Sequence, residues 1–277
     1  MPIPDVSASP LAELISLRGR RAVVTGGARG LGRAIAARLA EAGADVLLAD
    51  LEESLATQAA TELSAAHGTR VIATEVDVTD ASSVDHAAQY AARELGGLEI
   101  WVNNAGVFPA FGVLDSTDDQ WRQVHAVNVD GTFHGARAAA RHFARNDGGV
   151  VINIVSTAGF QAPAPGLAAY VASKHAVRGL TKELALELAP LGIRVLGVAP
   201  TFVPTEGNIA AAEAERTRAE AAGVDPSDAG MDVMTQSLIG RIGTPDDVAR
   251  VVLFAASDLS LFMTGSTMLA DAGETIR

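Results

Sequence analysis

The stretch AVVTGGARGLGRAIAARLAEAGADVLLAD, residues 22–50, contains an apolar β-branched run, a glycine-rich turn, a helical pattern and a second apolar run. Glycines at 26, 30 and 32 let backbone N–H groups at a helix N-terminus approach a pyrophosphate closely. The spacing Gly-x-x-x-Gly-x-Gly differs from Gly-x-Gly-x-x-Gly, and no Lys-Ser/Thr pair follows it, unlike a nucleoside triphosphate loop. The stretch therefore predicts a strand, turn, helix and strand that bind a dinucleotide; a glycine turn without a ligand is the alternative.

Similar apolar runs recur along the chain, with helical patterns between them. Strands that alternate with helices indicate right-handed βαβ units and a parallel sheet. Such a sheet is buried on both faces, which accounts for strands that are apolar almost throughout. The sequence therefore predicts an α/β fold, a single Rossmann-type, doubly wound, seven-stranded parallel sheet with helices on both faces. The predicted strands are residues 22–25, 45–50, 70–76, 98–103, 150–155, 193–198 and 266–270.

Two segments interrupt this alternation. Residues 1–18 precede the first strand and are predicted to form an N-terminal arm, and residues 19–277 a single dinucleotide-binding and catalytic domain. Residues 203–240 separate the sixth strand from the next clear helix and are interpreted as a partly helical insertion. Long excursions inside compact domains are often binding loops, so we expect a substrate lid near 203–240, with a solvated surface helix as the alternative.

Composition and charge exclude several function classes. The 277 residues are 48% hydrophobic and 19% charged, which is typical of a globular protein. The absence of cysteine excludes disulfides and Cys nucleophiles and favours the cytoplasm. A net charge of −12 repels nucleic acid and anionic lipid, and no signal peptide or apolar span is recognisable, so neither nucleic acid nor membrane is expected as a partner. The six histidines lack metal-ligand spacing, so no metal site is expected.

Two residues near the glycine turn point to different cofactors. Asp50 ends the second predicted strand, where a carboxylate accepts hydrogen bonds from the adenosine ribose and repels a 2′-phosphate. Arg29 lies inside the turn and would instead pair with that phosphate. We give more weight to Asp50 and expect NAD, with NADP as the alternative.

Tyr170 and Lys174 lie four residues apart in AAYVASK, residues 168–174, at the start of a predicted helix. Positions i and i+4 share one helix face, so the phenol and the ammonium can occupy one pocket. The ammonium is expected to lower the pKa of the phenol from about 10 and to suit it to proton transfer. Alone, such a pair is more often a chance feature of an amphipathic helix.

Taken together and in order, the motifs resemble those of the short-chain dehydrogenase/reductase family along nearly the whole chain. The resemblance implies an oxidoreductase that interconverts a secondary alcohol and its ketone with a nicotinamide cofactor, and it implies a homotetramer. The matching segments are TGGARGLG (25–32), DVTD (77–80), NNAG (103–106), VN (127–128), NIVSTAG (153–159), YVASK (170–174) and residues 237–273.

The resemblance also implies the site residues. In the implied catalytic tetrad, Ser156 would hydrogen-bond the substrate oxygen and Tyr170 would donate or remove its proton. Lys174 would hold the nicotinamide ribose, and Asn128 would support a water linked to it. The implied cofactor contacts are Gly26, Arg29, Gly30, Leu31, Gly32, Asp50, Asp77, Val78, Asn104, Tyr170, Lys174, Val203 and Thr205. The implied substrate contacts are Ser156, Phe160, Gln161 and Tyr170.

Three positions depart from the family pattern: Thr201 and Ala272 stand where it usually has Gly, and Val155 where it usually has Ser. A β-branched residue at 201 restricts the backbone beside the nicotinamide site that the resemblance implies, so we expect it to reshape the loop or the pocket there. Phe and Met side chains at 108, 111, 160, 202, 231 and 234 either belong to the core or flank the pocket, and in the second case they favour an apolar substrate.

Two alternatives remain open from the sequence. The first is an NADPH-dependent 3-oxoacyl thioester reductase, against which the lack of a basic cluster in residues 203–240 is a mild argument. The second is a non-catalytic regulator that senses NAD, against which the intact tetrad argues. Sugar, polyol and steroid dehydrogenases of the family are not separated by any motif in this chain.

Overall fold

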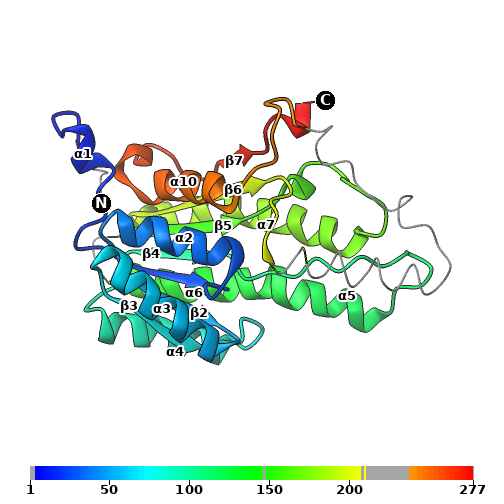
Figure 1. Cartoon of the computed structure of the whole chain (residues 1–277), viewed down its shortest axis with the longest axis horizontal. Coiled ribbons are helices and arrows are strands. Elements are labelled where there is room, and N and C mark those ends of the chain that lie inside the picture. Colours follow the sequence, from blue (N-terminus) through cyan, green and yellow to red (C-terminus); the bar gives the residue numbers. More distant parts are fainter. Residues whose placement is uncertain (1–3, 146–147, 207–208, 210–236, 277) are drawn as a thin grey trace.

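Seven parallel strands form one sheet in a computed structural model that describes residues 4–145, 148–206, 209 and 237–276 (Figure 1). The strand order is β3-β2-β1-β4-β5-β6-β7, so the chain changes direction across the sheet between β1 and β4. Ligands of open α/β sheets bind outside the carboxyl ends of the strands at such a point. The seven predicted strands are confirmed, and their observed bounds are Arg21–Thr25 (β1), Asp45–Asp50 (β2), Val71–Glu75 (β3), Ile100–Asn103 (β4), Gly149–Ile154 (β5), Ile193–Pro200 (β6) and Thr267–Ala270 (β7).

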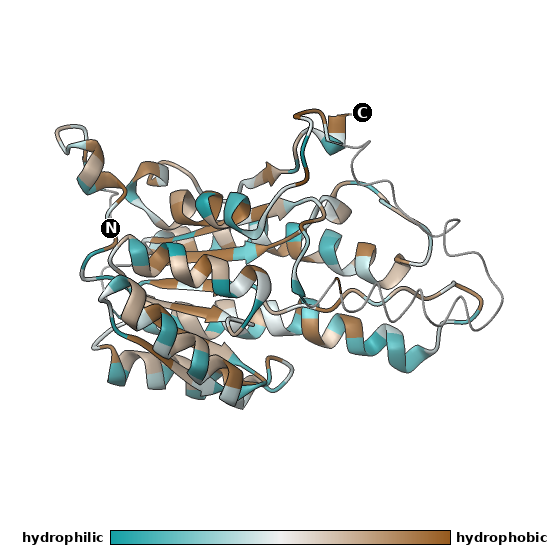
Figure 2. Cartoon of the chain, viewed as in Figure 1, coloured by the Kyte–Doolittle hydropathy of each residue, from teal (hydrophilic) through white to brown (hydrophobic). Residues whose placement is uncertain are grey.

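Helices cover both faces of the sheet, as the alternation predicts (Figure 1). Side chains of a strand alternate between faces, so Val24 packs with α2, α3 and α10, whereas Val23 packs with α4, α6 and α7. Figure 2 shows the strands between these layers as largely hydrophobic. The helices of the fold are α1 (Leu11–Leu14), α2 (Gly30–Glu41), α3 (Glu53–His67), α4 (Ala81–Glu94), α5 (Asp118–His125), α6 (Gly131–Phe143), α7 (Ala168–Leu188) and α10 (Pro245–Ala256). No helix in the described ranges is long and apolar enough to span a membrane.

The predicted N-terminal arm is attached to the domain at its end. Helix α1 buries no residue, but Leu17 is fully buried in the same apolar cluster as α2. The Leu17 N–H also donates to the carbonyl of Ala42, just after α2, at 2.8 Å. The last residues of the predicted arm therefore belong to the core, because a large apolar side chain there gains from burial.

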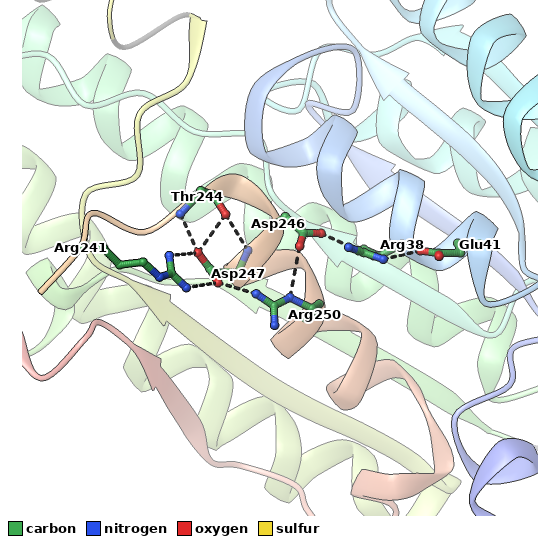
Figure 3. Close-up of polar contacts among 7 residues, drawn as sticks. All are labelled: Arg38, Glu41, Arg241, Thr244, Asp246, Asp247 and Arg250. Atoms are coloured by element: carbon green, nitrogen blue, oxygen red, sulfur yellow. Dashed lines mark hydrogen bonds and ion pairs between the residues drawn. The ribbon is translucent and has the colours of Figure 1, made fainter. Parts of the chain in front are cut away.

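The predicted lid, residues 203–240, lies largely outside the described residues, which include only 203–206, 209 and 237–240 of it. Ion pairs and hydrogen bonds hold the segment that follows it, from Arg241 to the start of α10 (Figure 3). The Arg241 guanidinium donates to both carboxylate oxygens of Asp247, at 2.6 and 2.7 Å, and holds the pKa of that carboxyl well below its usual range. Thr244 and Asp247 form a capping box at the start of α10.

A neighbouring carboxylate links α10 to the helix that follows the glycine turn. Asp246 accepts a hydrogen bond from Arg38 of α2 at 2.5 Å and one from Arg250 at 3.2 Å (Figure 3). These side chains are 33–55% exposed, so the individual ion pairs add little stability. The contact between Arg38 and Asp246 instead holds the first turn of α10 beside the last turn of α2.

Candidate active site

The turn after β1 is shaped to bring an anion close to the backbone. Gly26 and Gly30 have φ values of 62° and 55°, a left-handed conformation that glycine adopts without steric cost. A Cβ on Gly32 would lie 2.0 Å from the carbonyl oxygen of Gly26. The first N–H groups of α2 lack intrahelical partners, and its N-cap Arg29 supplies no side-chain cap. The turn, including Leu31 between these glycines, thus fits the pyrophosphate of a dinucleotide.

Asn104 and Thr25 hold this turn against the next strand. The Asn104 amide donates to the carbonyls of Thr25 and Gly26, at 2.9 and 3.0 Å. The Thr25 hydroxyl accepts from the N–H groups of Asn104 and Ala105, at 3.0 and 3.1 Å. The implied contact of Asn104 with the cofactor ribose remains a prediction, since its amide hydrogens are used within the protein. The sequence analysis missed Thr25, although a hydroxyl residue directly before the glycines was a usable signal.

The structure separates the two residues that point to different cofactors. Asp50 lies at the end of β2 and accepts hydrogen bonds from the N–H groups of Ala28 and Glu52, at 3.0 and 3.1 Å. Arg29 forms an exposed ion pair with the Glu52 carboxylate at 2.9 Å. Asp50 therefore faces the glycine turn directly, whereas the charge of Arg29 is already paired. Glu52 was not identified from the sequence.

The segment after β3, which contains Asp77 and Val78, packs against helix α6. Asp77 accepts hydrogen bonds from the N–H and hydroxyl of Thr79, at 2.9 and 2.7 Å. Val78 is buried, and its carbonyl lies 3.0 Å from Nδ1 of His134. A Cβ on Gly131 would lie 2.9 Å from the Val78 side chain, so glycine permits this close packing. The adenine contacts implied for Asp77 and Val78 remain predictions.

Tyr170 and Lys174 lie one turn apart on α7, next to the end of β5. The Lys174 ammonium lies 5.7 Å from the centre of the Tyr170 ring and donates to the carbonyl of Ile154 at 2.8 Å. Ser156, two residues further on, forms a hydrogen bond with Tyr170, and its hydroxyl also accepts from the N–H of Ala158 at 3.1 Å. The fold thus brings Ser156 to the helix face that carries Tyr170 and Lys174.

Burial controls the protonation of this cluster. It raises the pKa of Tyr170 above 10.0, although the hydrogen bond with Ser156 acts in the opposite direction. It also lowers the pKa of Lys174 from 10.5 to about 8. The expected acidification of the phenol by the ammonium is therefore not observed, because loss of solvation penalises the phenolate. Both shifts favour the neutral forms, and the ammonium releases its proton more readily than in water.

Asn128 supports the start of α7 from a π-helical turn, η1 (Ala126–Asp130). Its amide donates to the carbonyl of Val107 and the hydroxyl of Ser173, at 2.8 and 3.0 Å, and its oxygen accepts from the Val107 N–H at 2.8 Å. Ser173 in turn donates to the carbonyl of Tyr170 at 2.7 Å. The π turn, a feature frequent at functional sites, directs Asn128 into this network. Ser173 was missed, although its spacing of three from Tyr170 places it on the same helix face.

Gly106 separates Asn128 from Lys174. A Cβ on Gly106 would lie 3.3 Å from the Asn128 side-chain oxygen and 3.8 Å from the Lys174 ammonium. Glycine at this position therefore keeps side-chain atoms out of the space between an acceptor and a buried donor. The water implied between Asn128 and Lys174 remains a prediction, and this is the space into which it would fit.

The two residues implied on the substrate side differ in their surroundings. The face of Phe160 is covered by Arg178 of α7, whose guanidinium lies 3.9 Å from the ring centre. Gln161 is half-buried and donates to the carboxylate of Glu274 at 3.2 Å. Phe108 instead lies edge-on to Tyr170, with ring centres 6.2 Å apart, and is half exposed. Phe108 is therefore the aromatic side chain that borders the phenol.

The segment after β6 borders the glycine turn. A Cβ on Gly30 would lie 3.2 Å from the Cβ of Thr205, so these two segments are in close contact. Val203 is buried in the cluster that contains α2. The backbone before them is anchored by Thr201, whose N–H donates to the carbonyl of Ala270 at 3.3 Å. The nicotinamide contacts implied for Val203 and Thr205 remain predictions, made next to the turn where a cofactor fits.

The three departures from the family pattern have different consequences. The Thr201 hydroxyl donates a hydrogen bond to Glu274. Among the described residues, Ala272 is the one non-glycine residue with a positive φ, so the backbone of Thr201 is not in the left-handed conformation that would favour glycine. Ala272 has a φ of 52°, a conformation that favours glycine. Val155 is buried against Val177 and Ala199, where an apolar side chain packs well.

No group of three or more His, Asp or Glu side chains within the described ranges could hold a metal ion.

Comparison with known proteins places these features in a family context. A family model described as short chain dehydrogenase matches residues 20–216. The chain is 37% identical over 261 residues to 3beta-hydroxysteroid dehydrogenase 2 of Eggerthella lenta, covering 93% of this chain and 95% of that protein. It is 38% identical over 257 residues to L-2,3-butanediol dehydrogenase of Corynebacterium glutamicum, covering 91% and 97%. The crystal structure of a gluconate 5-dehydrogenase from Burkholderia cenocepacia, in complex with NADP and tartrate, superposes with a TM-score of 0.85 at 32% identity, covering 97% of this chain and 100% of that one.

Proposed function

This chain belongs to the short-chain dehydrogenase/reductase family, and we propose that it uses NAD to interconvert a secondary alcohol and its ketone, with Tyr170 as the general acid and base. The observation that carries the proposal is the cluster of Ser156, Tyr170 and Lys174 at the end of β5. In this cluster, Ser156 and Tyr170 share a hydrogen bond, and a buried ammonium lies 5.7 Å from the centre of the phenol ring. Perturbed titratable groups of this kind gather at functional sites.

The residues around the glycine turn fit the proposed cofactor. The first N–H groups of α2 would bind its pyrophosphate, and Asp50 would accept hydrogen bonds from the adenosine ribose. Lys174 and Asn104 would hold the second ribose, while residues 203–205 would lie against the nicotinamide. The bound nicotinamide supplies hydride chemistry: it accepts the carbon–hydrogen electron pair of the alcohol in oxidation and returns it in reduction.

The proton is handled by side chains of this chain. Ser156 donates a hydrogen bond to the substrate oxygen and so orients it. In oxidation Tyr170 acts as the phenolate: the O–H bond of the alcohol breaks and its proton passes to the phenolate oxygen, while the C–H bond gives up its electron pair as hydride and a carbonyl forms at the carbon. Reduction runs the same transfer in reverse. The charged form of Lys174, 5.7 Å from the centre of the Tyr170 ring, would offset part of the burial cost of the phenolate once Tyr170 has given up its proton.

Local charges support NAD over NADP. The gluconate 5-dehydrogenase structure holds NADP, so membership of the family does not fix the choice. In this chain Asp50 would face the 2′ position, and Arg29 is paired with Glu52 at 2.9 Å. A 2′-phosphate would therefore meet one carboxylate directly and would have to compete with a second for the guanidinium.

The cellular setting is part of the proposal. We propose a homotetramer in the cytoplasm, on the basis of the family resemblance and the lack of cysteine. Light scattering of the purified protein at several concentrations measures the first of these.

The test is a screen of secondary alcohols and ketones with NAD and NADP, followed by the absorbance of the reduced nicotinamide. The proposal predicts reduction of NAD by at least one class of secondary alcohol and a lower kcat/KM with NADP. Binding of NAD without turnover of any alcohol or ketone would favour the sensor alternative. A marked preference for NADP would show that Asp50 does not decide the cofactor.

A further inference from the structure

A buried carboxylate near the C-terminus connects to the substrate side of the site. Glu274, in the short turn η6 (Glu274–Ile276), is only 8% exposed. Its two oxygens accept from different segments: one from the Gln161 amide at 3.2 Å, and the other from the Thr201 hydroxyl. In the part of the chain that the structure describes, no basic side chain forms an ion pair with it. Neutral donors from two different segments therefore hold this carboxylate in place.

This carboxylate fixes the orientation of the Gln161 side chain. An ionised carboxylate only accepts hydrogen bonds, whereas a Gln amide has a donating and an accepting end. Gln161 must therefore present its NH₂ group to Glu274 and turn its oxygen, Oε1, away. Gln161 is half-buried and lies five residues after Ser156, just beyond the short 3-10 turn that Ser156 caps. The pair thus fixes which end of the Gln161 amide is left to accept a further hydrogen bond.

We propose that Gln161 Oε1 accepts a hydrogen bond from a second hydroxyl of the substrate, and that Glu274 is a positioning residue that holds Gln161 for this contact. The inference rests on the proposed function and narrows its substrate class. The substrate is an alcohol with a second hydroxyl near the reacting one, such as a vicinal diol, and the product is the corresponding hydroxyketone. The Phe108 ring lies edge-on to Tyr170, so an apolar side chain borders the phenol and would contact the carbon skeleton of such a substrate.

A hydrogen-bonding contact has a different signature from an apolar pocket. A site built to pair with a substrate hydroxyl discriminates strongly against the analogue that lacks it, because its polar group is then left unpaired. An apolar pocket discriminates weakly against an added hydroxyl. The ratio of kcat/KM between a diol and its single-hydroxyl analogue therefore reports on Gln161, independently of how fast the enzyme works.

The experiment measures kcat and KM with NAD for 2,3-butanediol against 2-butanol, and for 1,2-cyclohexanediol against cyclohexanol. We expect wild type to prefer at least one diol by roughly tenfold to hundredfold in kcat/KM, the range of one hydrogen bond to a buried polar group. Gln161→Leu is expected to bring this ratio close to one. Glu274→Ala is expected to lower the ratio mainly by raising the KM for the diol. Glu274→Gln is expected to keep an intermediate ratio, because its amide both accepts and donates.

The matched control is Gln58→Leu. Gln58 also donates to a glutamate, Glu62, at 2.9 Å, but on the exposed surface of α3. This variant should leave both the rate and the diol ratio unchanged. Circular dichroism and thermal melting check that each variant is folded, and if Glu274→Ala does not fold, Gln161→Leu decides.

The outcomes separate this inference from the proposed function. A wild type that oxidises the single-hydroxyl alcohols with no diol preference, or a Gln161→Leu variant that keeps the wild-type ratio, overturns the inference and leaves the proposed function standing. Reduction of neither NAD nor NADP by any alcohol in this set or in the wider screen overturns both.

Discussion

The two halves of the candidate site achieve their geometry in different ways. The cofactor half is made from backbone: glycines in left-handed conformations, the first N–H groups of α2, and carbonyls tied by Asn104. Its charged side chains, Asp50 and Arg29, have partners within the chain. The catalytic half is made from side chains, and burial shifts the pKa values of both Tyr170 and Lys174 toward the neutral forms.

The two halves should therefore respond differently to substitution. In the cofactor half the constraint is steric, so adding atoms should harm the fold and binding together. In the catalytic half a charge is buried at a cost, so removing it should increase stability while activity is lost. The predictions below test this contrast, beginning with the largest effect.

Tyr170→Phe should remove proton transfer without affecting the cofactor half. We expect kcat to fall by roughly 10²–10⁴-fold, the usual contribution of a positioned acid or base, with NAD affinity nearly unchanged. Steady-state kinetics and calorimetric titration with NAD measure the two quantities. Tyr90→Phe is the control, since the chain has two tyrosines and Tyr90, on α4, is the one outside the candidate site. Undiminished turnover by Tyr170→Phe would mean that another group moves the proton.

Gly32→Ala should damage the cofactor half. Its Cβ would lie 2.0 Å from the Gly26 carbonyl oxygen and 2.5 Å from the Asn104 amide, so the turn must shift. We expect a loss of about 3 kcal/mol in the free energy of unfolding, at the upper end for overpacking, together with weakened NAD binding. Gly179→Ala is the control, because a Cβ there meets nothing within 4 Å and should stabilise α7 by about 0.5–1 kcal/mol. Equal effects of the two substitutions would contradict the steric account.

Lys174→Met should stabilise the chain while abolishing activity. Burial lowers the pKa of Lys174 from 10.5 to about 8, a cost of roughly 3 kcal/mol to the charged form. Loss of the hydrogen bond to Ile154 offsets about 1 kcal/mol of this, so we expect a net gain of about 2 kcal/mol at pH 7. Lys182→Met, an exposed lysine on the same helix, should have little effect.

The pH dependence of that gain follows from the same shift. Below pH 8 the lysine is charged in both the folded and unfolded states, and the burial cost is present in full. As the pH rises from about 8 toward 10.5, the folded state releases the proton before the unfolded state does. Wild-type stability therefore rises relative to Lys174→Met, and the difference narrows. Denaturant unfolding at pH 7 and pH 10 measures it, and a difference that widens with pH has the wrong sign for this account.

Glu52→Ala should release Arg29 and shift the cofactor preference toward NADP. A charge-assisted contact with the 2′-phosphate would raise the ratio of kcat/KM for NADP over NAD by about tenfold. Glu53→Ala is the control for net charge, because this glutamate is the next residue and lies in the first turn of α3. An equal shift in both variants would indicate general electrostatics in place of a released guanidinium.

Ala272→Gly should have the smallest effect. Glycine relieves about 1 kcal/mol of strain at a φ of 52°, but it also gains freedom in the unfolded chain. We expect a net stabilisation of about 0.5 kcal/mol, which corresponds to a rise in Tm of about 1–2 °C. A decrease in Tm would show that the left-handed conformation carries no strain here.

The sequence determined the strands, the helices and the elements of the site that depend on local order. Apolar periodicity identified seven strands, glycine spacing identified the turn, and a spacing of four placed Tyr170 and Lys174 on one helix face. Hydrophobic periodicity and helix geometry are local properties, so a single sequence contains them.

Only the tertiary structure decided which side chains meet and how they are charged. The contact of Gln161 with Glu274 joins residues more than a hundred positions apart, and the pairing of Arg29 with Glu52 crosses from one βα turn to the next. The direction of the pKa shift at Tyr170 was wrong from the sequence, because desolvation depends on all the elements packed around the phenol. Spacing along the chain gives proximity within one helix, whereas burial is a property of the whole fold.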